Sequence, residues 1–153
     1  MPEYAIVPAT MAHAEELAAN MRKADVAEIW AAGRHKPLEA LKLSLVVSRD
    51  PKAGLVDGRV VCMFGIAAPT LMSFTGVPWL LGSEELARHW RYFLRANIPV
   101  VARMREEYDV LANYVDARNK TAIRWLKWLG FDIKEAQPYG PDGLPFHRFE
   151  MKA

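Results

Sequence analysis

The chain has 153 residues, enough for one domain with a buried core. Hydrophobic residues make up 52% of it and charged residues 25%, which is typical of a globular protein and excludes a disordered one. The formal net charge of +2 gives no strong indication of nucleic-acid binding, and a single cysteine, Cys62, excludes an intramolecular disulfide and a cysteine-based zinc site.

No segment reaches the roughly 18 apolar residues of a membrane span, and the N-terminus lacks a signal-peptide pattern. We therefore expect a cytoplasmic protein without membrane contact. The four histidines show no metal-ligand spacing, so no metal site is predicted. Residues 86–153 hold 12 Lys and Arg against 8 Asp and Glu. This basic half could attract a phosphorylated ligand, or it could form a solvated helix face.

The first third of the chain predicts a strand followed by two helices. A strand is expected over 4–7, and Thr10 can cap a helix that runs from Met11 to about Ala32. Pro37 suits the first turn of a second helix, reaching about Val46.

The middle third predicts strands and then a helix. A strand over 54–58 enters an Asp-Gly turn, and the apolar run 59–68 reads as a central strand covered on both faces. Residues 75–78 are expected to form a loop and 79–81 a strand. Ser83 would cap the next helix, and Pro99 would interrupt or restart it before Tyr108.

The last third predicts a strand over 110–115, a helix over 121–129 closed by Gly130, and strands over 131–134 and 146–151 joined by a turn at 141–143. The element order indicates one mixed α/β domain over residues 1–153. Its early strands are antiparallel, and a βαβ unit comes late.

One segment carries a family resemblance. Asn119, Ala122, Gly130 and Phe131 match the pattern N-x-x-A, seven residues, G-F, after a strand that ends in Val115. This pattern and the element order resemble the GNAT acyltransferase superfamily, where the segment flanks the acyl-CoA site. The resemblance implies a mixed central sheet with a splayed parallel strand pair, flanking helices and a C-terminal β-hairpin. It also implies transfer of acetyl from acetyl-CoA to an amine.

The same half of the chain resembles GNAT-like phage proteins, closest to the internal virion protein A family of T7-like phages. The resemblance rests on segments 79–83, 108–109, 113–115, 119, 123–124 and 126–127. It implies a phage source, with the protein in the host cytoplasm or the virion. It also keeps open a non-catalytic role, as a virion core component or a binder of a host protein.

The GNAT resemblance implies a set of cofactor-binding residues. The backbone of Trp79, Leu80 and Leu81 would pair with pantetheine, the amides around Ser83 and Glu85 would hold the pyrophosphate, and Arg88, Asn119 and Arg124 would contact the rest of the cofactor. Each of the last three also has a structural interpretation, because Asn119 can cap the 121–129 helix and arginines often lie on exposed helix faces. Ser83 is favoured as a helix cap.

The chemistry requires a base and benefits from an acid. Glu28 and Glu84 are candidates to take a proton from the amine, and Tyr108 is a candidate donor to the leaving thiolate; solvated surface is the alternative for the glutamates. Two family features are missing. The residues after Gly82 lack the glycine-rich phosphate turn, and Leu126 stands where many relatives carry a tyrosine acid.

The expected partners are a CoA thioester and an amine acceptor, together with a phage or host protein if the chain is not catalytic. The apolar C-terminal hairpin offers a surface for a homodimer. Two hypotheses thus remain, an N-acetyltransferase and a non-catalytic protein of the same fold.

Overall fold

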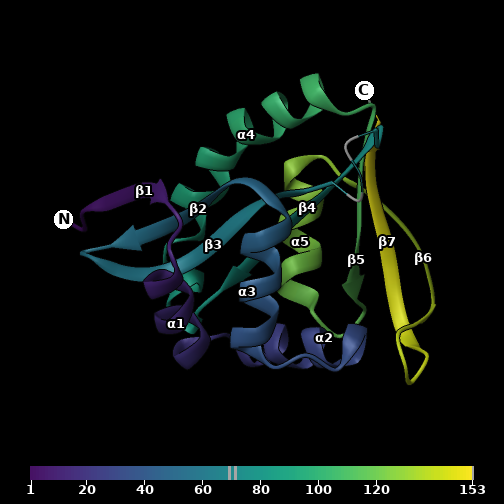
Figure 1. Cartoon of the computed structure of the whole chain (residues 1–153), viewed down its shortest axis with the longest axis horizontal. Coiled ribbons are helices and arrows are strands. Elements are labelled where there is room, and N and C mark those ends of the chain that lie inside the picture. Colours follow the sequence, from purple (N-terminus) through teal and green to yellow (C-terminus); the bar gives the residue numbers. More distant parts are fainter. Residues whose placement is uncertain (69, 71, 153) are drawn as a thin grey trace.

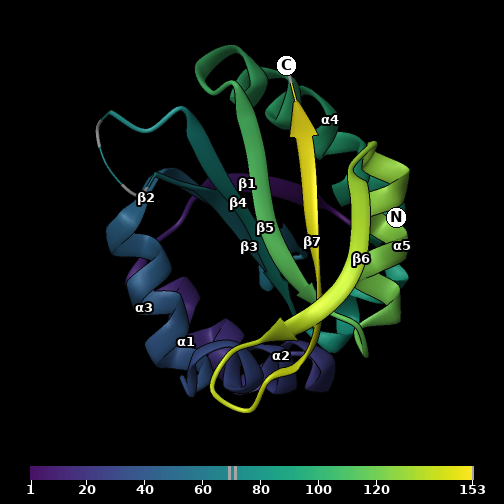
Figure 2. The same cartoon turned by 90° about the vertical axis from the view of Figure 1, so that its right-hand side faces the viewer.

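A seven-stranded mixed sheet runs through the molecule in the order β1-β2-β3-β4-β5-β7-β6, with helices on both faces (Figures 1 and 2). The computed structural model describes residues 1–68, 70 and 72–152. The strands are β1 (Tyr4–Pro8), β2 (Ser48–Val56), β3 (Arg59–Ala67), β4 (Thr75–Gly82), β5 (Val110–Asp116), β6 (Asp132–Tyr139) and β7 (Leu144–Lys152). The helices are α1 (Met11–Asn20), α2 (Lys23–Gly33), α3 (Pro37–Val47), the 3-10 helix η1 (Glu84–Arg88), α4 (Trp90–Glu107) and α5 (Lys120–Leu129).

The strand pairing is antiparallel except between β4 and β5, which are parallel. These two strands pair only at Thr75–Val110 and Gly76–Leu111. Beyond this point they diverge, whereas β5 stays paired with β7 along its whole length. The expected splayed pair is therefore present, and it opens toward the carboxyl ends of β4 and β5.

The helix expected over 11–32 is two helices, and the single-helix prediction is wrong. Met21 adopts an extended conformation with ψ of 142° and forms a bridge with Ser83. The amide of Arg22 then donates to the carbonyl of Gly82 at 2.8 Å. Pairing with the end of β4 replaces the helical hydrogen bonds at this point, so α2 starts in a new direction beside the splay.

The segment around β4 also differs from the prediction. Residues 75–78, expected to be a loop, belong to β4, because Pro78 pairs with Ile66 of β3. The helix expected after Ser83 is divided into η1 and α4, and Pro99 lies inside α4. Ser83 makes no side-chain cap, so that prediction is wrong.

Several local signals are confirmed. The hydroxyl of Thr10 accepts from the amide of His13 at 3.2 Å at the start of α1. Asp57 and Gly58 both have positive φ, as a tight hairpin turn of this type requires. Gly130, with φ of 102°, ends α5 in the left-handed conformation that glycine adopts readily.

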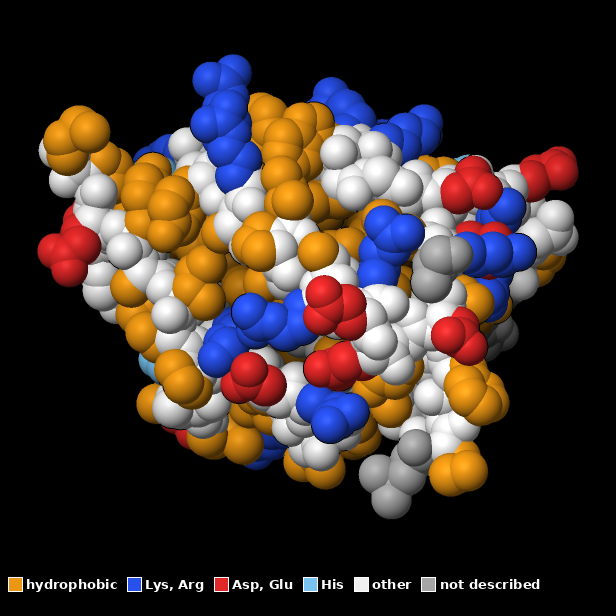
Figure 3. Space-filling model, turned by 90° about the horizontal axis from the view of Figure 1, so that it is seen from above, with side chains coloured by type: hydrophobic (Ala, Val, Ile, Leu, Met, Phe, Trp, Pro, Cys, Tyr) orange, Lys and Arg blue, Asp and Glu red, His pale blue; other side chains and the backbone are white. Residues whose placement is uncertain are grey.

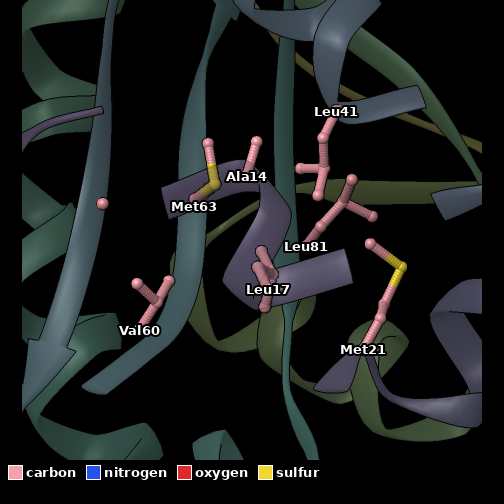
Figure 4. Packing of buried hydrophobic residues seen from close by; sticks show 8 residues of the cluster. Ala14, Leu17, Met21, Leu41, Val60, Met63 and Leu81 are labelled. Atoms are coloured by element: carbon pink, nitrogen blue, oxygen red, sulfur yellow. The ribbon is translucent and has the colours of Figure 1, made fainter. Parts of the chain in front are cut away.

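The sheet separates two helix layers, each with its own core. The α1–α3 layer packs against β3 and β4 through a cluster that contains Leu17, Leu41 and Met63 (Figure 4). The α4–α5 layer packs through two clusters on the opposite face. Cys62 lies fully buried in one of them, and burial raises its thiol pKa to about 12, so it is an inert core residue as expected.

None of the helices in the described part of the chain is both long enough and apolar enough to cross a membrane.

Candidate functional site

A cavity of about 270 Å³ occupies the splay between β4 and β5. Both helix layers contribute to its walls, so it passes through the sheet. On the α2–α3 side it is lined by Glu28, Ile29, Ala32, Ala40, Ser44, Trp79, Tyr114, Tyr139 and Phe146. On the α4–α5 side it is lined by Leu80, Leu94, Asn97, Val101, Met104, Trp125, Leu126 and Leu129.

Glu28 is the one carboxylate among the described residues that line the cavity. It sits on α2, and its Oε1 accepts from the amide of Asp116 at 2.8 Å and from the Asn119 side-chain amide at 3.3 Å. Burial raises the pKa of Glu28 to about 7, and the nearby charge of Asp25 contributes in the same direction. A carboxylate with this pKa can exchange a proton near neutral pH.

A buried polar network holds Glu28 in place. Asp25, one turn earlier on α2, accepts from Arg22 at 2.9 Å and from Asn119 at 3.1 Å. Asn119 in turn accepts from Arg22 at 3.3 Å, and the Arg22 guanidinium lies 5.2 Å from the ring centre of Trp125. Burial raises the pKa of Asp25, although the charge of Arg22 opposes this shift.

Asn119 is committed to this network. Its side-chain oxygen accepts from Arg22 and from the amide of Ala122 at 3.4 Å, and its nitrogen donates to Asp25 and Glu28. The helix-cap interpretation of Asn119 is therefore confirmed. With both donors and both acceptor positions in use and 2% of its surface exposed, Asn119 positions Glu28 and is screened from a ligand.

The open edge of β4 is largely covered by the chain's own groups. Pro78 has no amide hydrogen, and its carbonyl accepts from the Asn113 side chain at 2.9 Å. The Gly82 amide donates to Asp25 at 2.9 Å, and its carbonyl accepts from the Arg22 amide. Antiparallel pairing alternates, so the amide and carbonyl of Leu80, between these two residues, also point into the splay.

The facing edge of β5 is covered in the same way. The Tyr114 amide donates to the Asn113 side-chain oxygen at 2.7 Å, and the Asp116 amide donates to Glu28. Asn113 thus bridges the two diverging strands. At the described edge of β4, the backbone amide and carbonyl of Leu80 therefore remain available to hydrogen-bond a ligand.

The turn after β4 differs from a phosphate-binding turn. The Ser83 amide donates to the Val61 carbonyl at 2.9 Å, and the buried Ser83 hydroxyl has no hydrogen-bond partner among the described residues. Glu84 accepts from the Lys23 amide at 2.8 Å, and Glu85 accepts from Arg59 Nε at 3.2 Å. The carboxylates that replace a glycine-rich turn are held by side chains and amides of neighbouring elements.

The structure brings together only some of the predicted site residues. Glu28, Trp79, Leu80 and Leu81 line the cavity, with Asn119 directly behind it. Ser83, Glu84 and Glu85 line a separate hollow next to α1, and Arg88 and Arg124 are exposed outside the cavity.

Tyr108, expected to donate a proton, lies in the core and not in the cavity. It is 6% exposed and packs where β4 and β5 are still paired, so closely to Gly76 that a Cβ there would lie 2.8 Å from its ring. It cannot reach a ligand in the splay from this position.

Sequence reasoning missed Arg22, Asp25 and Asn113. For Asp25 a signal was available, because it precedes Glu28 by three residues and so shares its helix face. For Asn113 and Arg22 the deciding partners are distant, because Asn113 donates to Pro78 of β4 and Arg22 donates to Asn119, 97 positions away.

The outer face that carries α4 is mixed in character. Figure 3 looks onto the side of the molecule that carries α4, where Lys and Arg side chains lie among hydrophobic ones. Within the described part of the chain, no group of three or more His, Cys, Asp and Glu residues is arranged to hold a metal ion.

Comparison with known proteins identifies the fold. No protein-family model and no curated protein matches the chain. Solved structures do: Ard1 from Thermoplasma volcanium has a TM-score of 0.73 at 16% identity, covering 98% of this chain and 97% of its own. An acetyltransferase of the GNAT family from Streptococcus pneumoniae has a TM-score of 0.64 at 15% identity, covering 99% and 100%.

A third structure, yncA from Salmonella typhimurium with acetyl-CoA, has a TM-score of 0.63 at 12% identity, covering 98% of this chain and 94% of its own. The expected fold is therefore confirmed: the chain has a GNAT-like α/β architecture with a seven-stranded mixed sheet and a C-terminal hairpin. At these identities the similarity concerns the fold alone.

Proposed function

We propose that this protein is an acyl-CoA-dependent N-acetyltransferase that uses Glu28 as its general base. The observation that carries the proposal is Glu28, the one carboxylate among the described residues that line the apolar cavity at the splay of β4 and β5, with its pKa raised to about 7. A GNAT-like neighbour solved with acetyl-CoA supports the choice of co-substrate.

The proposed reaction begins with an amine bound as its ammonium form. Glu28 removes one proton, which gives the nitrogen a free electron pair. This pair forms a C–N bond with the thioester carbonyl carbon, and the C–S bond then breaks as the carbonyl re-forms. The sulfur leaves as a thiolate, and the second nitrogen proton passes to this thiolate, which leaves a neutral amide and the free thiol of CoA. Because a thiol has a pKa of about 8.5, this departure needs no tyrosine acid, consistent with leucine at position 126.

The described residues fit one part of acetyl-CoA better than the other. The apolar cavity and the backbone of Leu80 suit the pantetheine arm and the acetyl group. Glu84 and Glu85, at the position expected for the pyrophosphate, would repel it. We therefore propose that Leu80 and its β4 neighbours bind the pantetheine, and that Arg88 and Arg124 provide the remaining attraction for the phosphates.

Calorimetry with acetyl-CoA, paired with a thiol-release assay on a panel of amines, tests this function. We expect binding together with CoA release that requires the amine. At 100 times the dissociation constant, acetyl-CoA should stabilise the fold by about 2.7 kcal/mol. Absence of binding at millimolar acetyl-CoA would remove the enzyme proposal.

A second candidate function is a non-catalytic phage protein of the same fold, a virion core component or a binder of a host protein. This second function is favoured because the chain's own side chains bond the splayed edge of β4. Asn113 donates to the Pro78 carbonyl, and Asp25 accepts from the Gly82 amide. Proteomic detection in purified virions would support the virion version. Absence from virions, with acetyl transfer observed, would leave the enzyme.

A further inference from the structure

We propose that the amine acceptor is a small primary amine on an uncharged, apolar or aromatic skeleton, and not an amino acid or a peptide. This inference rests on the proposed acetyltransferase function and names its substrate class. Three properties of the α2–α3 side of the cavity lead to it: its charge, its aromatic walls and its closure by the β6–β7 hairpin.

The charge of the acceptor side is the first property. Among the described lining residues Glu28 carries the only acidic or basic side chain. A carboxylate in this wall favours a cationic ammonium. An acceptor that also carried its own carboxylate would bury that group beside Glu28 with no cation to pair with it, which is strongly unfavourable.

The neighbouring cations are already engaged. Arg148 is hydrogen-bonded to Glu150 at 3.3 Å. Arg118 forms a two-pronged contact with Asp116, and Arg22 is bound to Asp25. An acceptor carboxylate would have to compete with these protein carboxylates for the guanidinium groups.

Aromatic walls are the second property. The rings of Tyr114 and Tyr139 stack with centres 4.2 Å apart, and Phe146 lies 5.0 Å from Tyr139. Trp79 closes the opposite wall, and its ring nitrogen donates to Ser48 at 2.7 Å, so its orientation is defined. Aromatic faces attract an ammonium group and bury an apolar skeleton at the same time.

Closure by the β6–β7 hairpin is the third property. The turn after β6 packs against the end of α2, so closely that a Cβ on Gly140 would lie 2.0 Å from the carbonyl oxygen of Ala31. The side chains of Arg34 and Asp142 form an ion pair across the same contact. This contact blocks the passage between the hairpin and α2, so an extended peptide cannot lie along it.

A matched set of acceptors tests the inference. Phenethylamine and phenylalanine share a ring and an amine and differ by one carboxylate, and an octapeptide represents protein N-termini. With saturating acetyl-CoA we expect kcat/KM for phenethylamine to exceed that for phenylalanine by at least 100-fold, with the peptide inactive. Comparable or higher values for phenylalanine or the peptide would overturn the inference while leaving acetyl transfer established.

A cation placed in the wall should change this preference. Ser44 lines the cavity from α3, so Ser44→Arg should raise the phenylalanine-to-phenethylamine ratio of kcat/KM at least 10-fold. Leu43→Arg is the matched control, because Leu43 is 47% exposed on the same helix and lies outside the cavity. An unchanged ratio in a folded Ser44→Arg protein, or the same change in both variants, would contradict the charge argument.

Direct binding separates this inference from the function on which it rests. If no acceptor is acetylated, phenethylamine and phenylalanine are titrated against the full chain by calorimetry. Preferential binding of phenethylamine would support the acceptor class although the transferase proposal had failed. Equal binding, or no binding of either at millimolar concentration, would overturn the acceptor class itself.

Discussion

The two ends of the proposed site differ in how well they suit the chemistry. On the α2 side, Glu28 sits in an apolar cavity and is held by Asn119 and Asp116 in a geometry suited to a base. On the turn between β4 and α4, Glu84 and Glu85 stand where phosphates would be expected. In the proposed enzyme, proton transfer and cofactor anchoring would therefore depend on separate elements, so that one can be altered while the other stays intact.

Replacing the proposed base should have the largest effect, because it should lower kcat and leave acetyl-CoA binding nearly unchanged. Glu28→Gln keeps an oxygen to accept from Asp116 but cannot take a proton. We expect kcat to fall about 100- to 10,000-fold at pH 8 with little change in acetyl-CoA affinity. Steady-state kinetics and calorimetry measure the two effects. Glu15→Gln, on the exposed surface of α1, is the control; a Glu28→Gln enzyme as active as the control would exclude Glu28 as the base.

Breaking the network behind the base should cost stability as well as activity. Asn119→Ala removes the cap of α5 and takes one buried hydrogen bond each from Arg22, Asp25 and Glu28, although Arg22 and Asp25 stay paired. We expect a loss of about 2–4 kcal/mol in the free energy of unfolding, measured by urea denaturation. Asn119→Ser restores the capping oxygen alone and should recover only about 1 kcal/mol. Full recovery by serine would mean that capping is the whole role of Asn119.

The raised pKa of Glu28 predicts a pH-dependent stability. Between its ordinary value of 4.5 and about 7 the folded state binds more protons than the unfolded state, so this contribution is complete below pH 4.5 and is lost as pH rises through 7. Glu28→Gln has no titratable group at position 28, so it does not lose stability as pH rises through this range. It should therefore be more stable than wild type by about 3 kcal/mol at pH 8, with no such gain at pH 4.

Urea denaturation of both proteins across this pH range checks the sign. Wild-type and Glu28→Gln stability curves that stay parallel from pH 4 to 8 would show that the Glu28 pKa is not raised by folding. Activity should change in the opposite direction to stability: kcat/KM should increase as pH rises toward 7.

The smallest effect is expected at the altered turn. Glu85→Gln removes one negative charge and releases Arg59, so acetyl-CoA should bind about 3- to 10-fold more tightly at low salt. The gain should disappear at 1 M salt. S-acetylpantetheine, which lacks the phosphates, is the control ligand and should bind both proteins equally. Unchanged acetyl-CoA affinity would show that the phosphates lie elsewhere.

Much of the fold could be predicted because its signals are local. The cap at Thr10, the Asp57-Gly58 turn and the stop at Gly130 each depend on a few adjacent residues. Two predictions failed where pairing with a distant strand decided the outcome. Met21 left its helix to bridge Ser83, and residues 75–78 joined the sheet through β3.

The site was less predictable because its members meet only in the folded chain. Glu28 and Asn119 could be named as candidates, yet their hydrogen bond joins residues 91 positions apart. Glu84 and Tyr108, equally plausible by residue type, lie in a different hollow and in the core. The residues next to Glu84 and Glu28 in the sequence do not indicate that Glu84 is exposed and that burial raises the pKa of Glu28.

The sequence alone therefore determined the mixed α/β class, the cap at Thr10 and the stop at Gly130, the Asn119 to Phe131 pattern and the absence of a glycine-rich turn. These properties follow from local backbone preferences and from residue identity. Only the tertiary structure decided which carboxylate enters the cavity, how Asn113 and Asp25 cover the splayed edges, and that Asn119 supports Glu28. Those outcomes depend on sheet register and burial, which bring distant residues together and shift their protonation.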